Sequence, residues 1–95
     1  MTLNKQEFLT SAGLRVQTLE LWLEQRWLIP TESASGVLFS DGDVARARLI
    51  QDLKGDFGIN DEGIDVILHL IDQLHGARQA FALLRAMVND TPGSV

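Results

Sequence analysis

The two histidines are the side chains in this sequence best suited to acid–base or metal chemistry. His69 follows Asp65 by four residues and precedes Asp72 by three, so on a helix the three side chains would form a carboxylate–histidine cluster. His75 is six residues from His69 and therefore does not share its helix face. Because this spacing fits no metal-ligand or general-base pattern, we interpret His69 as an exposed, salt-linked histidine.

Other patterns that support catalysis are missing from the sequence. It contains no glycine-rich phosphate loop, no nucleophile with a matching base, and no cysteine, which excludes disulfides and thiolate metal sites. The sequence therefore predicts a protein that is not an enzyme and has no catalytic, cofactor-binding or metal site.

Composition predicts one small, folded, cytoplasmic domain. The chain has 95 residues, of which 45% are hydrophobic, so it can form one core and is not disordered as a whole. No apolar run approaches the roughly 18 residues of a membrane span. The N-terminal segment MTLNKQEF also lacks the apolar core of a signal peptide.

The charge balance is acidic along the whole chain. Eight Lys and Arg residues stand against thirteen Asp and Glu residues, which gives a net charge of −5, and neither the part up to Asp56 nor the remainder is basic. A basic surface normally supplies most nucleic-acid affinity, whereas an acidic surface favours a basic protein partner. The simpler alternative is that the charge keeps a small domain soluble.

Capping residues predict where three of the helices begin. The patterns N-x-x-E at Asn4 and S-x-x-D at Ser40 have the spacing of capping boxes, which places helices over residues 5–12 and 40–54. Asn60, followed by two acids, begins the longest helix. The expected inward residues of the helix at 40–54 are Val44, Ala47, Leu49 or Ile50, and Leu53.

A further helix, Val16–Arg26, is predicted from its hydrophobic period. Its expected inward residues are Val16, Leu19, Leu23 and Trp27, with Trp22 beside them at the edge. The segment TESASG at 31–36 is predicted as a polar turn, and GVLF at 36–39 as one strand or an extended rung of a small wing.

The last helix carries a heptad repeat. Its apolar residues recur at alternating spacings of three and four, at Ile67, Leu70, Leu74, Ala77, Phe81, Leu84 and Val88. Such a repeat joins two helices into a coiled coil. We therefore predict a homodimer, with a seam formed by Leu74, Ala77, Phe81, Leu84 and Val88. The alternative is that this helix folds back on its own bundle.

The N-terminal part resembles the MerR-type winged helix-turn-helix. The pair Thr18 and Leu19 matches the start of that family's second helix, and RWLIP at 26–30 matches its corner. Gly36 and Phe39 match the wing, and SDGDV then begins the next helix. The resemblance extends from residue 3 to about residue 71.

This resemblance implies the fold and its organisation. The expected fold is all-α, or mainly helical, with a helix-turn-helix, a short degenerate wing and a long C-terminal helix. Three parts are expected: a helix-turn-helix module at 1–57, a long helix for dimerisation and packing at 58–90, and a flexible tail at 91–95.

Several positions depart from the MerR pattern. Glu20 stands where the pattern has an arginine, and Leu21 and Trp22 stand where it has aromatic residues. Arg26 replaces the corner glycine, and the wing segment SASGVLF has none of the usual arginines. The helix that normally enters a DNA groove has therefore lost the cations that such binding needs.

These departures, together with Leu49–Leu84, resemble the chaperone-modulator family CbpM. That resemblance implies a small regulator that binds the J-domain of a DnaJ-like co-chaperone of the CbpA type and blocks its stimulation of Hsp70. Because J-domains present a basic helical face, an acidic competitor is electrostatically suitable.

Two acidic patches are candidates for docking this partner, and the sequence does not choose between them. The first consists of Glu20, Trp22 and Glu24, and the second of Asp61, Glu62 and Asp65. The alternative function is a MerR-like DNA-binding regulator, in which phosphates would be contacted by Arg15, Arg46, Arg48 and Lys54. We consider nucleic-acid binding the less favoured function.

Overall fold

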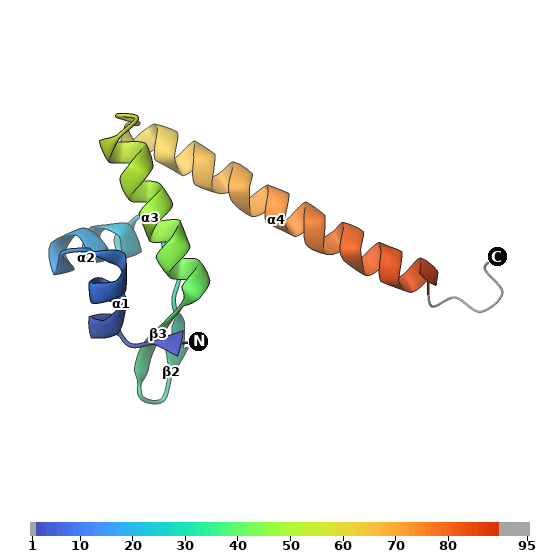
Figure 1. The fold of residues 1–95 in the computed structure, drawn as a ribbon, viewed down its shortest axis with the longest axis horizontal. Coiled ribbons are helices and arrows are strands. Elements are labelled where there is room, and N and C mark those ends of the chain that lie inside the picture. Colours follow the sequence, from blue (N-terminus) through green and yellow to red (C-terminus); the bar gives the residue numbers. More distant parts are fainter. Residues whose placement is uncertain (1, 90–95) are drawn as a thin grey trace. The chain divides into compact units, whose positions relative to one another are not determined.

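The computed structural model describes residues 2–89 and is mainly helical, as predicted (Figure 1). Its elements are β1 (Thr2–Leu3), α1 (Lys5–Ala12), α2 (Val16–Glu24), β2 (Thr31–Ser33), β3 (Gly36–Ser40), α3 (Asp41–Gly55) and α4 (Asp61–Asn89). They form two compact units, which divide between Ile64 and Asp65. The predicted tail at 91–95 lies outside the described residues.

Both predicted capping boxes are confirmed. The Glu7 amide donates to Asn4 Oδ1 at 2.8 Å, and the Asn4 amide donates to Glu7 Oε1 at 2.9 Å. Ser40 and Asp43 make the same reciprocal pair at 3.1 and 2.8 Å at the start of α3. Each box satisfies two amides that have no partner in the first helical turn, and so fixes where its helix begins.

The end of α2 is set by a Schellman motif, two residues before the predicted end at Arg26. The Trp27 amide donates to the Trp22 carbonyl at 3.0 Å, and the Arg26 amide donates to the Leu23 carbonyl at 3.1 Å. This pattern requires a left-handed residue, and Arg26 has a φ of 61°. Arg26 thus adopts the conformation that the corner glycine would favour.

The wing is a true hairpin. Its second strand, β3, contains the strand predicted at 36–39, whereas the segment predicted as a polar turn begins with another strand, β2. Thr31 pairs with Leu38 and Ser33 with Gly36, so that β2 and β3 are antiparallel. Gly36 has a φ of 119°, and Ser33 Oγ donates to its carbonyl at 2.7 Å, which closes the turn. The unpredicted β1 adds to the other edge of β3, giving the order β1-β3-β2.

The core of the first unit lies between the helices and β3. Phe8 of α1 and Phe39 of β3 stack with ring centroids 4.1 Å apart. Other fully buried side chains of the unit are Leu19, Leu28, Ala47, Ile50 and Ile64. The helices, β1 and β3 contribute buried residues to this core, whereas β2 is exposed along its length.

Some of the predicted inward residues are placed differently. Val16 is exposed and Leu23 only half-buried, because the inward row of α2 runs through Leu19 and Trp22. In α3 the choice between Leu49 and Ile50 is resolved, since Ile50 is buried and Leu49 lies at the surface.

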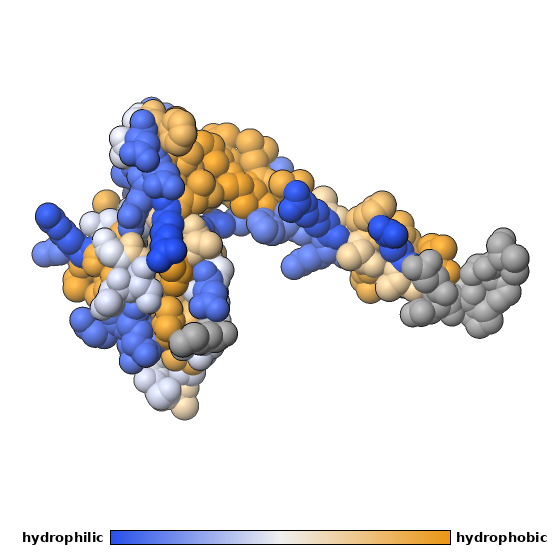
Figure 2. Space-filling view, viewed as in Figure 1, coloured by the Kyte–Doolittle hydropathy of each residue, from blue (hydrophilic) through white to orange (hydrophobic). Residues whose placement is uncertain are grey.

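Helix α4 is continuous and contains the whole predicted heptad repeat. Asn60 Oδ1 accepts the Gly63 amide at 2.8 Å, which confirms its predicted role at the start of the helix. Apolar side chains are exposed along the helix (Figure 2). Seam residues that are more than half exposed are Leu74, Phe81, Leu84 and Val88. Among residues 2–89, no helix combines the length and apolarity that crossing a membrane requires.

Candidate functional site

The outer face of α2 is a mixed acidic and apolar stripe. Gln17, Glu20, Leu21 and Glu24 are all exposed, and their spacing places them on one side of the helix. Glu20 forms an ion pair with Lys5 of α1 at 2.5 Å, whereas Glu24 has no polar partner among residues 2–89. We call these four residues the α2 face.

Trp22 does not belong to this face, which corrects its predicted place in an exposed patch. Its side chain is only 3% exposed and lies against Trp27, with ring centroids 6.1 Å apart. The cause is the Schellman motif, in which the residues at these two positions regularly form a hydrophobic contact. Trp27, predicted to be core, is buried as expected.

The apolar residue of the α2 face is Leu21, which sequence reasoning missed. Its side chain is 46% exposed, between the two carboxylates of the face. The spacing from Gln17 to Leu21 and from Leu21 to Glu24, four and three residues, contained the signal. The neighbouring tryptophan was the more prominent candidate, because tryptophan is a common binding hot spot.

The second predicted patch lies in the first two turns of α4. Asp61, Glu62 and Asp65 are all exposed, and Asp61 and Asp65 are four residues apart on this continuous helix. Asp61 also forms an ion pair with Lys54 of α3, which neutralises part of the patch. Nearby in the chain, Phe57 is 71% exposed in the loop before α4, a feature that the sequence analysis did not single out.

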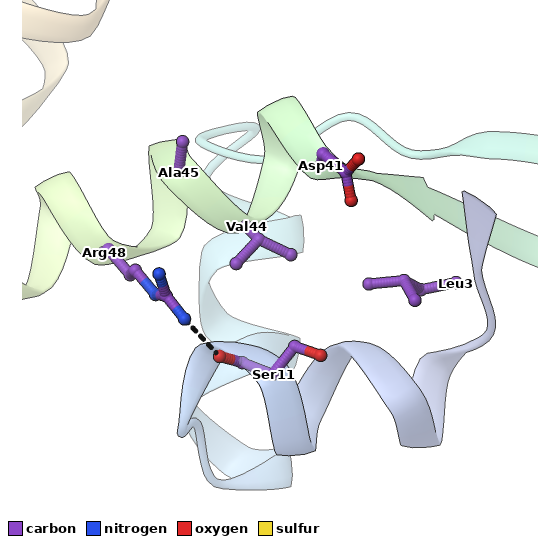
Figure 3. Close-up of a pocket in the computed structure, with 6 residues that line it drawn as sticks. All are labelled: Leu3, Ser11, Asp41, Val44, Ala45 and Arg48. Carbon is purple, nitrogen blue, oxygen red and sulfur yellow. Dashed lines mark hydrogen bonds between the residues drawn. The ribbon is translucent and has the colours of Figure 1, made fainter. Parts of the chain in front are cut away.

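Most cations of the first unit are engaged within the fold. Arg46 Nε donates to the Trp27 carbonyl at 2.6 Å, and Arg48 Nη2 donates to the Ser11 carbonyl at 3.1 Å. The second bond joins α3 to α1 beside a depression of about 360 Å³ (Figure 3). The Lys54 ammonium lies 5.4 Å from the centre of the Trp27 ring, in addition to its ion pair.

The cations of the first unit without any polar partner among residues 2–89 are the two that flank α2. Arg15 occupies the N-cap position of α2 without making a side-chain cap, and Arg26 lies just beyond its end. Both are exposed. A DNA-binding function would therefore have these two residues available, rather than Arg46, Arg48 and Lys54.

A shallow groove of about 240 Å³ lies between the end of α2 and the hairpin. We call it the corner groove; its lining residues are Leu23, Arg26, Leu28, Ile29, Pro30, Glu32 and Val37. Ile29 is 71% exposed and Val37 39% exposed, so the groove presents an apolar surface to solvent. Sequence reasoning missed it because it depends on how the hairpin folds.

Both histidines lie on α4 and are exposed. His69 Nε2 lies 3.1 Å from Nε2 of Gln73, one turn along the same helix. Within residues 2–89, no three His, Asp or Glu side chains gather in a way that could hold a metal ion.

Comparison with known proteins finds one family. A family model described as MerR HTH family regulatory protein matches residues 3–86. No curated protein and no solved structure matches the chain. The matched range begins in β1 and ends within α4, so it includes the helix-turn-helix, the hairpin and most of the long helix.

Proposed function

The chain belongs to the MerR HTH family of regulatory proteins, and from this premise we propose that it regulates by binding a protein, without enzymatic activity. The proposed partner is the J-domain of a DnaJ-like co-chaperone in the cytoplasm. By occupying that J-domain, the protein would inhibit its stimulation of Hsp70. The choice of partner follows from the resemblance of Leu49–Leu84 to the CbpM chaperone modulators.

The observation that carries this proposal is the chemistry of the α2 face. In a DNA-reading helix this face offers arginine or lysine to base edges and phosphates. Here it offers two carboxylates, an amide and an exposed leucine. Carboxylates repel a polyanion, whereas a leucine between carboxylates suits a protein surface that combines apolar and basic side chains.

The engagement of the cations supports the same choice. Lys5 and Lys54 neutralise carboxylates of the fold, and Arg46 and Arg48 bond to main-chain carbonyls. Using them for phosphates would require breaking these contacts. Nucleic-acid affinity depends on the number of phosphates that cations neutralise, so this arrangement weakens the case for DNA.

DNA binding is the second candidate, and the family match favours it. Arg15 and Arg26 lie at opposite ends of α2 and are exposed, so each could contact a phosphate. Phosphate contacts position a protein on DNA but do not select a sequence. This candidate therefore predicts weak, salt-sensitive binding with little sequence preference.

The two candidates are separated by one binding experiment. The purified chain is mixed with an isolated J-domain and, separately, with duplex DNA, at two salt concentrations. We expect saturable J-domain binding, no retention of DNA, and a loss of J-domain-stimulated Hsp70 ATPase activity as the chain is added. Tight DNA binding that falls steeply with salt, without J-domain binding, would reverse the ranking.

We also propose that the protein is a homodimer joined through α4. The heptad residues from Leu70 to Val88 are exposed in the single chain, over several turns. An isolated helix with such a stripe gains stability by pairing with another, because pairing removes the apolar side chains from water. A second copy of the same helix supplies the matching repeat.

A further inference from the structure

The corner groove is an exposed apolar surface next to the α2 face, and the proposed function does not involve it. Its two hairpin residues, Glu32 and Val37, are register partners on β2 and β3, so their side chains share one face of the hairpin. Across the groove lies the corner with Ile29 and Arg26. The groove thus holds an apolar floor together with one cation and one anion.

Arg26 is an unusual residue for its position. A left-handed φ of 61° is costly for a side chain with a Cβ atom, and glycine would adopt it without strain. Its guanidinium has no polar partner among residues 2–89 that could offset this cost. Strained residues of this kind concentrate at functional sites. This favours a role of the Arg26 side chain in binding rather than in stabilising the isolated fold.

We infer that the corner groove receives an aliphatic side chain from a helix of the partner protein, with a carboxylate of that helix on Arg26. Glu32 faces the same groove and is free to pair with a basic residue of the same helix. The charges of the groove therefore define the occupant: an amphipathic segment with an acid and a base on either side of an aliphatic residue. This inference rests on the proposed function, since the segment belongs to the proposed partner.

The surroundings of Arg26 favour a protein carboxylate over a nucleic-acid phosphate. Glu24 and Glu32 lie near it in the chain, and neither is paired within residues 2–89. A duplex carries closely spaced phosphates that would approach these carboxylates together with Arg26. A protein segment can present one acid to the arginine and keep its other charges away from the glutamates.

The test is the substitution Arg26→Gly, because it separates folding from binding. Glycine relieves the strain, so the variant is expected to melt at a higher temperature than the wild type. The same change removes the guanidinium, so J-domain affinity is expected to fall by about tenfold, the loss typical of a charged hydrogen bond. Circular dichroism measures the first effect and isothermal titration calorimetry the second.

Two further variants act as controls. Arg15→Ala removes the matched exposed cation at the other end of α2 and should leave J-domain affinity within about twofold of wild type. Ile29→Asp charges the apolar floor at a solvent-exposed residue and should weaken binding as Arg26→Gly does, without loss of folding.

The outcomes separate this inference from the proposed function. If the wild type binds the J-domain and Arg26→Gly binds equally well, the groove assignment is wrong and the proposed function stands. If the wild type does not bind the J-domain at all, both are overturned. If Arg26→Gly loses retention on duplex DNA while J-domain binding is unchanged, the groove faces nucleic acid and the inference is rejected.

Discussion

Arg26 combines a backbone conformation that is unfavourable for folding with a side chain at a candidate binding surface. It holds the position that ends α2 and redirects the chain into the corner, and it does so with a backbone conformation that favours glycine. Arg26 is one of the residues that line the corner groove, and its guanidinium makes no hydrogen bond or ion pair within the described part of the chain. At this scale, stability and binding make opposite demands on one side chain.

Replacing Arg26 with glycine is expected to raise the free energy of unfolding by about 1 kcal/mol, because the left-handed backbone is no longer strained. Urea unfolding should show a higher midpoint with an unchanged slope. The matched control is Gln25→Gly, one residue earlier at a φ of −73°. At that position glycine relieves no strain and only increases the conformational entropy of the unfolded chain. Gln25→Gly should therefore be less stable than the wild type by roughly 0.5–1 kcal/mol.

Trp22 and Leu21 are neighbours with opposite roles, and truncation should separate them. Trp22→Ala removes a buried ring that packs on Trp27, so we expect a loss of about 3–5 kcal/mol and, in so small a domain, a largely unfolded chain. Leu21→Ala should change stability by only about 0.5 kcal/mol. Equal effects of the two changes on the urea midpoint would show that the burial of Trp22 is wrong.

Helix α4 belongs to the element scale, because its function depends on a stripe and not on any single residue. The helix runs from Asp61 to Asn89, and its capping by Asn60 fixes the start from which the heptad register is counted. Seven heptad residues share one stripe along it. A heptad stripe of this length is the pattern by which two helices pack side by side in a coiled coil.

Phe81→Glu is expected to convert the proposed dimer into monomers, because it places a charge in the middle of the apolar seam. Light scattering at several concentrations gives the mass directly. Gln79→Glu introduces the same charge at an exposed position outside the heptad positions and should keep the dimer. A variant Phe81→Glu that keeps the mass of the wild type would rule out this seam.

At the scale of the whole molecule, the charge of −5 is less informative than where the charges lie. Glu20 and Asp61 are each paired with a lysine, so the two predicted acidic patches are both weaker than their composition indicates. Glu24 and Glu62, by contrast, are exposed and have no polar side-chain partner in the described part of the chain. These two residues therefore allow the patches to be compared.

Glu24→Lys and Glu62→Lys change the net charge of the molecule equally, so any difference between them is local. If docking uses the α2 face and the corner groove, Glu24→Lys should weaken J-domain binding by roughly fivefold. Glu62→Lys should have a smaller effect that disappears at high salt. The reverse order, measured by calorimetry at two salt concentrations, would move the docking site to the start of α4.

The sequence alone determined the features whose signals are local. The two capping boxes, the start of α4 at Asn60 and the heptad repeat are each read within a few turns of one helix, and the structure contains all of them. The family match covers the same helix-turn-helix that the Thr18–Leu19 pair and the corner indicated. Local hydrogen bonds and side-chain spacing suffice for these predictions, because they do not depend on distant parts of the chain.

Only the tertiary structure decided which side chains face outward and what surfaces they form. Trp22 is buried and lies against Trp27, whereas Leu21, one residue earlier on α2, is exposed. The corner groove exists because the hairpin, which the sequence left open, places Glu32 and Val37 opposite the end of that helix. Burial is set by contacts between segments distant in sequence, and a one-residue change in register moves a side chain from core to surface. Spacing within one segment indicates which side chains share a face, but not which face packs against a distant segment.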